Sequence, residues 1–156
     1  MQFPLGISSN PLKVSEKLQE AKAVWTDEGW VVEGNLRLSN FELLQLPTIL
    51  KVGGNFWCSN NQLVTLQGAP QKVGGSFWCN NNQLITLEGA PQKVGGRFCC
   101  DYNQLATLEG APQSVGAGFY CDNNQLATLE GAPQSVGGGF YCYNNLVKLT
   151  YVKNLK

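Results

Sequence analysis

The amino-acid sequence predicts a repeat solenoid, in which short and similar units stack along one axis. A step of 21 residues separates successive valines, phenylalanines and cysteines through most of the chain. The recurring residues are Val52, Val73, Val94, Val115 and Val136; Phe56, Phe77, Phe98, Phe119 and Phe140; and Cys58, Cys79, Cys100, Cys121 and Cys142. A fixed period of about 20 to 50 residues is typical of such stacked architectures.

Each unit contains a short segment with the two-residue alternation of a β-strand. In one unit, Phe98 and Cys100 point to one side of the predicted strand. Arg97, Cys99 and Asp101 point to the other side. Two glycines before the segment allow a sharp turn into it, and the Gly-Ala-Pro sequence after it favours an extended or turn-like path. We therefore expect one parallel β-sheet with extended or turn return limbs on the opposite face, in a short, gently curved slab with strands about 4.8 Å apart.

An asparagine recurs at the corner after each predicted strand. The five copies are Asn61, Asn82, Asn103, Asn124 and Asn145. An amide at such a corner can bond the backbone of neighbouring turns, so the pattern predicts a stacked asparagine ladder. The leucines that follow, such as Leu105 and Leu108, are expected to point inward. In a disguised first repeat, Leu36 and Leu38 take the places of the Phe and the Cys.

The chain has the length of one domain, which divides into three parts. Residues 1–31 do not repeat, and an apolar stripe over Leu12–Trp25 predicts an amphipathic helix that begins after Asn10 and covers the open end of the first repeat. Six repeats occupy 32–149 and begin at Val32, Val52, Val73, Val94, Val115 and Val136. Residues 150–156 are expected to form a C-terminal cap or tail.

The cysteines are expected to be reduced. Five of the six recur at an inward position beside phenylalanine, where a free cysteine behaves as a small apolar side chain. The N-terminal segment MQFPLGISSN lacks the pattern of a signal peptide, and no apolar stretch is long enough to span a bilayer. These features favour a cytoplasmic protein. A metal-binding cysteine ladder is the alternative, but it would lack CxxC spacing and any histidine.

The charge distribution argues against some classes of partner. The formal net charge is zero, so we expect neither nucleic acid nor an anionic membrane as a partner. Between Phe98 and Val147 the sequence holds acids but no lysine or arginine. The acids are Asp101, Glu109, Asp122 and Glu130. Asp101 and Asp122 are expected to attract a basic patch on a partner, whereas Glu109 and Glu130 are expected to lie on a solvated edge of the return side.

The outward positions of the predicted strands are rich in aromatic residues. The position after each Phe, which we call the aromatic column, is occupied by Arg37, Trp57, Trp78, Cys99, Tyr120 and Tyr141. Two positions earlier the residues are Asn35, Asn55, Ser76, Arg97, Gly118 and Gly139, and two positions later they are Ser39, Ser59, Asn80, Asp101, Asp122 and Tyr143. The small Gly118 and Gly139 are expected to leave the rings of Tyr120 and Tyr141 accessible.

Two interpretations of this face compete. Trp, Tyr and Arg dominate protein interfaces, which favours a binding surface. Its predicted partner-binding residues are Arg37, Trp57, Trp78, Arg97, Asp101, Tyr120, Asp122, Tyr141 and Tyr143. In the purely structural interpretation, neighbouring rings stack and stabilise the sheet by about 0.2–1 kcal/mol per pair. The two effects are compatible.

The repeat pattern F-x-C-x-x-N-x-L-x-x-L-x-x-x-P resembles the leucine-rich repeat, with Phe and Cys in two of the usual leucine positions. Its short length and the Pro on the return limb are similar to the bacterial short-repeat type, and GAPQ..VGG.F.C..NQL.TL is similar to repeats of bacterial and phage proteins. The resemblance covers Val32 to about Leu149. It implies a fold and a concave protein-binding sheet, without the catalytic domain that some effectors of this type carry.

We therefore expect a non-enzymatic, protein-binding module without cofactor, metal or catalytic residues, such as a bacterial or phage effector or inhibitor of a host protein. Glycan or small-molecule binding on the aromatic column is one alternative. Self-assembly through the C-terminal strand edge is another. No triad, phosphate loop or metal motif favours an enzyme. A reactive thiol at Cys99 beside Arg97, and an acid–base or cation-binding pair of Asp101 and Asp122, are weaker candidates.

Overall fold

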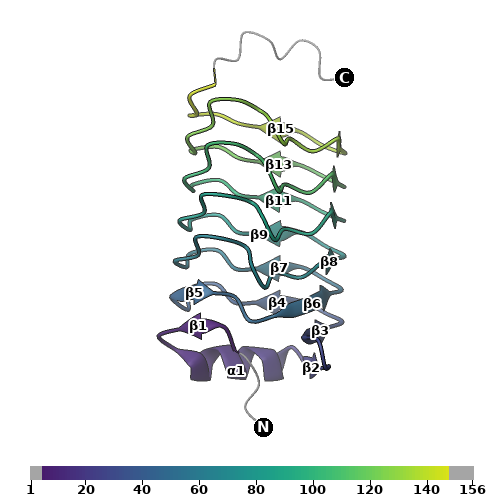
Figure 1. The fold of residues 1–156 in the computed structure, drawn as a ribbon. Helices are drawn as coiled ribbons and strands as arrows, with labels where there is room; N and C mark the ends of the chain where they lie inside the picture. The colour runs from purple at the N-terminus through teal and green to yellow at the C-terminus, as the bar shows by residue number, and fades with distance from the viewer. Residues whose placement is uncertain (1–4, 148–156) are drawn as a thin grey trace.

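The structure is a parallel β-solenoid built on two main sheets. It is a computed structural model that describes residues 5–147 (Figure 1). The first sheet, which we call the Phe sheet, contains β4 (Leu36–Arg37), β7 (Phe56–Trp57), β9 (Phe77–Trp78), β11 (Phe98–Cys99), β13 (Phe119–Tyr120) and β15 (Phe140–Tyr141). The second, the Val sheet, contains β2 (Val24–Trp25), β3 (Trp30–Val32), β6 (Ile49–Val52), β8 (Lys72–Val73), β10 (Lys93–Val94), β12 (Ser114–Val115) and β14 (Ser135–Val136).

The register stacks equivalent residues of successive turns. Phe98 lies opposite Phe77 on one side and Phe119 on the other, in parallel strands. Leu36 of the disguised first repeat lies opposite Phe56, as the sequence alignment predicts. The predicted parallel sheet and its repeat are confirmed.

The return limbs differ from the prediction, because they contain the Val sheet and not only turns. When nearly identical turns stack in register, every extended segment meets its own copy and can pair with it, including the segment before the Gly-Gly corner. The expected gentle curvature is also wrong: Figure 1 shows the turns stacked in a nearly straight column. Both faces carry parallel strands, which have the same separation of about 4.8 Å, so neither face is shortened into a concave one.

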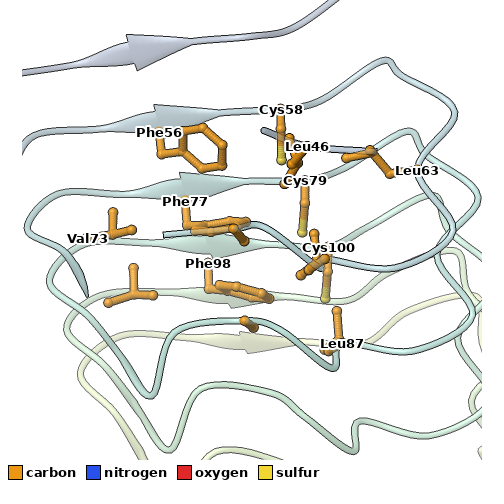
Figure 2. Packing of buried hydrophobic residues seen from close by; sticks show 14 of the residues in the cluster. Leu46, Phe56, Cys58, Leu63, Val73, Phe77, Cys79, Leu87, Phe98 and Cys100 are labelled. Carbon is orange, nitrogen blue, oxygen red and sulfur yellow. The ribbon is translucent and has the colours of Figure 1, made fainter. Parts of the chain in front are cut away.

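The core consists of columns of identical side chains. Phe56, Phe77, Phe98 and Phe119 have no exposed surface, and neighbouring ring centroids in the column lie 5.1–5.5 Å apart. Figure 2 shows this Phe column beside the column of inward cysteines. The leucines that follow the corner, such as Leu105 and Leu108, are also fully buried. The inward half of the repeat is therefore placed as predicted.

The inward thiols are buried and form no disulfide bonds. Burial raises the pKa of each one above its ordinary value of 9.0. The thiol of Cys100 donates a hydrogen bond to the carbonyl oxygen of Tyr120 in the next turn, with a sulfur–oxygen distance of 3.3 Å. Cys79 and Cys121 make the equivalent bond at 3.3 and 3.2 Å. The inward thiols thus donate hydrogen bonds to backbone carbonyls in addition to filling the core.

The predicted asparagine ladder is confirmed, and Asn103 shows its geometry. The side-chain Nδ2 donates to the carbonyl oxygens of Cys100 in the same turn and Cys79 in the preceding turn, at 3.0 and 3.1 Å. Its Oδ1 accepts the backbone N–H of Leu84 at 3.0 Å. Each such amide therefore ties two turns together at the corner.

The first glycine of each Gly-Gly pair is required by the stacking. A Cβ on Gly95 would lie 2.0 Å from the carbonyl oxygen of Gly74 in the preceding turn. That oxygen belongs to the backbone and cannot move aside without displacing the turn. A side chain at this corner is therefore excluded.

The N-terminal region begins with α1 (Pro11–Glu20), which is shorter than the predicted helix. Lys22 has φ 53°, a left-handed conformation that ends the helix, and Trp25 lies in the antiparallel β2–β3 hairpin. Val14 and Leu18 are buried in the core cluster, and α1 packs against β4. The sequence also did not predict β1 (Ile7–Ser8), which pairs with β5 (Leu43–Gln45) in a separate antiparallel sheet.

No helix within residues 5–147 is long and apolar enough to cross a membrane. The predicted C-terminal cap or tail, residues 150–156, lies outside the described residues, as does Leu149 of the last repeat.

Candidate binding surface on the Phe sheet

The structure brings the residues of the aromatic column together on the outward face of the Phe sheet. Trp57 and Trp78 stack with ring centroids 4.7 Å apart and an interplanar angle of 1°. Tyr120 and Tyr141 stack at 4.7 Å and 11°. All four rings are half-buried. The guanidinium of the exposed Arg37 lies 5.2 Å from the ring centroid of Trp57, and so extends the first stack by one turn.

Cys99 divides the column into these two stacks. Only 8% of its surface is exposed, because a short side chain lies between the larger Trp78 and Tyr120 on the neighbouring strands. Burial, and then the charge of Asp101, raise the pKa of the Cys99 thiol to about 12, against the opposing effect of Arg97. Cys99 thus lies on the outward face of the sheet as predicted, but its burial and raised pKa disfavour the thiolate that a reactive thiol needs.

The two glycines of the preceding column lie close to the tyrosine rings, and of the two Gly118 is buried while Gly139 is exposed. A Cβ on Gly118 would lie 2.7 Å from a ring carbon of Tyr120, and one on Gly139 would lie 2.4 Å from the hydroxyl of Tyr141. Each ring therefore leans along its strand over a glycine. The glycine makes room for the ring, so the two tyrosine rings are half-buried and less accessible than the sequence predicted.

The flanking polar residues form bonds along the sheet. The Oδ1 of Asn55 accepts the backbone N–H of Ser76 at 2.7 Å, and the Oγ of Ser76 accepts the N–H of Arg97 at 2.9 Å. On the other flank, the hydroxyls of Ser39 and Ser59 share a 3.0 Å hydrogen bond, and both residues are buried. These hydrogen bonds link successive turns on the two flanks of the aromatic column. The charged residues on the flanks remain directed at solvent.

The charged residues of the predicted site lie at both flanks of the column. Arg97 is exposed and forms no ion pair within residues 5–147. Asp101 is half-buried, and burial raises the pKa of its carboxyl, with a smaller contribution from Asp122 on the next strand. The Oδ1 of Asp122 accepts the backbone N–H of Tyr143 at 2.5 Å, and the exposed Tyr143 ring lies 6.5 Å from that of Tyr141.

Tyr102 is a surface residue that the sequence reasoning missed. It is 55% exposed and has φ 54°, a left-handed conformation that is uncommon for a bulky side chain. In the other turns this position holds an asparagine, which tolerates that conformation better: Asn40, Asn60, Asn81, Asn123 and Asn144. The signal was present in the sequence as DYNQL, where the neighbouring copies carry NNNQL and DNNQL.

Comparisons of the chain with protein-family models, curated proteins and solved structures return no match. Within residues 5–147 no group of three or more His, Cys, Asp or Glu side chains is placed to hold a metal ion. The chemistry of the surface must therefore be argued from its own residues, which are stacked rings, two flanking carboxylates and two exposed guanidinium groups.

Proposed function

We propose that the chain is a non-enzymatic protein-binding module that uses the outward face of the Phe sheet. The supporting observation is the aromatic column: four half-buried rings form two stacks on a regular sheet, with Arg37, Arg97, Asp101 and Asp122 around them. Rings fixed in stacks lose little conformational freedom on binding, and Trp, Tyr and Arg contribute most of the affinity in protein interfaces.

The wider setting follows from the repeat and the cysteines. We propose that the chain is related to the bacterial or phage short-repeat type of leucine-rich-repeat protein, and that it acts as an effector or inhibitor of a host protein. In this proposal α1 caps the first turn, because it contributes Val14 and Leu18 to the core there. A cytoplasmic location is supported by the absence of disulfides among the buried cysteines, which a reducing compartment would preserve.

Glycan binding on the aromatic column is less favoured by this geometry. Sugars stack on ring faces, whereas Trp57 and Trp78 cover one face of each other, as do Tyr120 and Tyr141. Self-assembly at the C-terminal edge has a specific observation in its favour. In the last described turn Phe140 is only half-buried, although its counterparts in the preceding turns are fully buried.

The proposal can be tested with two substitutions on one strand that face opposite ways. Trp78→Ser removes an outward ring and is expected to abolish retention of the native partner, while it costs about 1 kcal/mol of stability through the lost ring stack. Phe77→Leu is the matched control, because it costs a similar amount, about 1 kcal/mol, in the core and leaves the surface intact.

Affinity purification from the native host, followed by thermal unfolding of each variant, gives the two readouts. The proposal requires Phe77→Leu to keep the partner and Trp78→Ser to lose it at equal stability. If both variants keep the partner, the aromatic column is a structural ladder and the proposal fails.

A further inference from the structure

One turn of the solenoid differs from the others at several outward positions at once. In this turn Arg97 replaces the Asn, Ser or Gly of the other turns, Cys99 interrupts the aromatic column, and Tyr102 replaces an asparagine. Asp101 lies between them on the same face, and only the next turn repeats it, as Asp122. The inward residues of the turn match those of its neighbours, so the core does not account for these changes.

The ring faces beside Cys99 are the free ends of the two stacks. The outer face of Trp57 already holds the guanidinium of Arg37 at 5.2 Å. The faces of Trp78 and Tyr120 that are directed away from their stacking partners have no ring or guanidinium against them within residues 5–147. Their strands are two sheet steps apart, about 9.6 Å. A flat group over Cys99 would thus lie about 4.8 Å from each ring position, within the distance of about 6 Å for cation–π contact.

The groups on the flank of this position accept hydrogen bonds. Asp101 is half-buried next to Asp122, and both its burial and this neighbouring charge raise the pKa of its carboxyl. No lysine or arginine occurs between Phe98 and Val147. The flank therefore presents the carboxylates of Asp101 and Asp122, and the nearest cation in the sequence, Arg97, lies on the other side of Cys99.

We propose that the partner protein inserts an arginine side chain over Cys99, with its guanidinium between Trp78 and Tyr120 and its N–H groups directed at Asp101. This inference rests on the proposed function, because it names the chemical group by which the partner is held at the same face. An arginine fits better than a lysine, since a guanidinium is flat, stacks on aromatic rings and matches the geometry of a carboxylate. Arg37 on Trp57 is the same type of contact made within the chain.

Tyr102 and Arg97 give the partner segment a direction. In this turn Arg97, Cys99, Asp101 and Tyr102 follow one another along the chain, and we call them the row. Tyr102 comes directly after Asp101 and offers an exposed ring at the end of the row. Arg97, on the opposite side of Cys99, is exposed and forms no ion pair with the other described residues, so it would repel a second cation and attract an acid. The row thus selects a segment with an arginine toward Asp101 and an acidic or neutral residue toward Arg97.

The test uses two peptides, acetyl-Gly-Arg-Gly-amide and acetyl-Gly-Lys-Gly-amide, titrated into the full chain labelled with nitrogen-15. Backbone amide shifts identify the contact, and a single exposed side chain should bind in the millimolar range. The arginine peptide is expected to shift the amides of Trp78, Cys99 and Tyr120 in a saturable way. The lysine peptide is expected to bind roughly fivefold more weakly, because its ammonium cannot stack on both rings.

Three variants separate the proposed contact from general attraction to acids. Cys99→Trp fills the column and should abolish arginine binding, while Cys99→Ser keeps the size of the side chain and should retain it. Asp101→Asn keeps the shape but removes the charge, and should weaken binding roughly tenfold. If Cys99→Trp does not fold, Asp101→Asn alone still tests the proposed arginine contact. Equal binding of both peptides, or arginine binding that survives Cys99→Trp and Asp101→Asn, would overturn the inference, as would an absence of saturable shifts.

The outcomes also separate this inference from the proposed function. If the native partner requires Trp78 but is indifferent to Cys99→Trp and is not displaced by the arginine peptide, the protein-binding function stands and the arginine contact is wrong. If the peptide binds as expected while the partner ignores Trp78→Ser, the contact exists but the proposed function fails.

Discussion

The asparagine ladder makes the sharpest prediction about stability, and Asn103→Ala is the change that tests it. Removal of the amide takes its two shorter bonds from the carbonyl oxygens of Cys79 and Cys100, and a longer one of 3.3 Å from that of Asp101. Each oxygen keeps a second donor, because Asn82 also donates to Cys79 and Asn124 to Cys100. The two shorter bonds cost about 0.5–1.5 kcal/mol each.

The backbone N–H of Leu84 has no second acceptor among the described residues. Its acceptor is the Oδ1 of Asn103, and Leu84 is fully buried, so the substitution leaves this donor unsatisfied at a cost of about 1–3 kcal/mol. Together the contributions give a loss of about 2–6 kcal/mol in the free energy of unfolding. Gln104→Ala, in the exposed residue that follows, removes a similar amide and should change stability by less than about 0.5 kcal/mol.

Urea unfolding followed by circular dichroism measures both variants, and an unchanged m value shows that the same surface unfolds. If Asn103→Ala is as stable as Gln104→Ala, the ladder does not hold the turns together. A wild-type-like Asn103→Asp variant would lead to the same conclusion, since that side chain can accept from Leu84 but cannot donate to the two carbonyls.

Three further outcomes follow from the described contacts. Tyr102→Asn should raise the free energy of unfolding by about 1 kcal/mol in calorimetry, because asparagine tolerates the left-handed backbone; a loss of stability would contradict this. Cys100→Ser should cost only about 1 kcal/mol in urea unfolding, since the Tyr120 carbonyl can accept from the new hydroxyl; a loss of several kcal/mol would mean that this bond is not made. Burial raises the pKa of Asp101 above 3.8, so its stabilising contribution is present at low pH and is lost as pH rises through the folded-state pKa. Asp101→Asn should therefore be more stable than the wild type near neutral pH and equal to it below about pH 4, and a variant that is less stable at neutral pH would reverse the sign.

The inward half of the repeat was predictable from the sequence because identical side chains at a constant step have one way to stack. Phe98, Cys100 and Asn103 lie where the period of two and the corner chemistry place them. The Val sheet was not predicted, because a two-residue extended segment has no pattern of its own and forms a strand only when its copy lies beside it. The end of α1 was placed too late for a similar reason, since Trp25 continues the apolar stripe but pairs with Trp30 in a hairpin.

The outward face was predictable in composition but not in detail. Alternation places Cys99 and Tyr120 on the same face, but it does not say how far each side chain reaches or in which direction it leans. Cys99 is buried because its neighbours are larger, and Tyr120 lies over Gly118 because nothing else occupies that space. Both facts depend on the sizes of side chains on three neighbouring strands. The sequence of a single repeat does not contain this information.

Hydroxyl-radical footprinting of the complex with the native partner tests the binding surface most directly. The labelling of individual side chains is compared between the free and the bound chain. The account predicts protection of Trp57, Trp78, Tyr120 and Tyr141, with no change at Ile85, which is 58% exposed and lies outside the outward positions of the Phe sheet. Unchanged labelling of the four rings, with protection at Ile85, would show that the partner binds another face and would contradict the account.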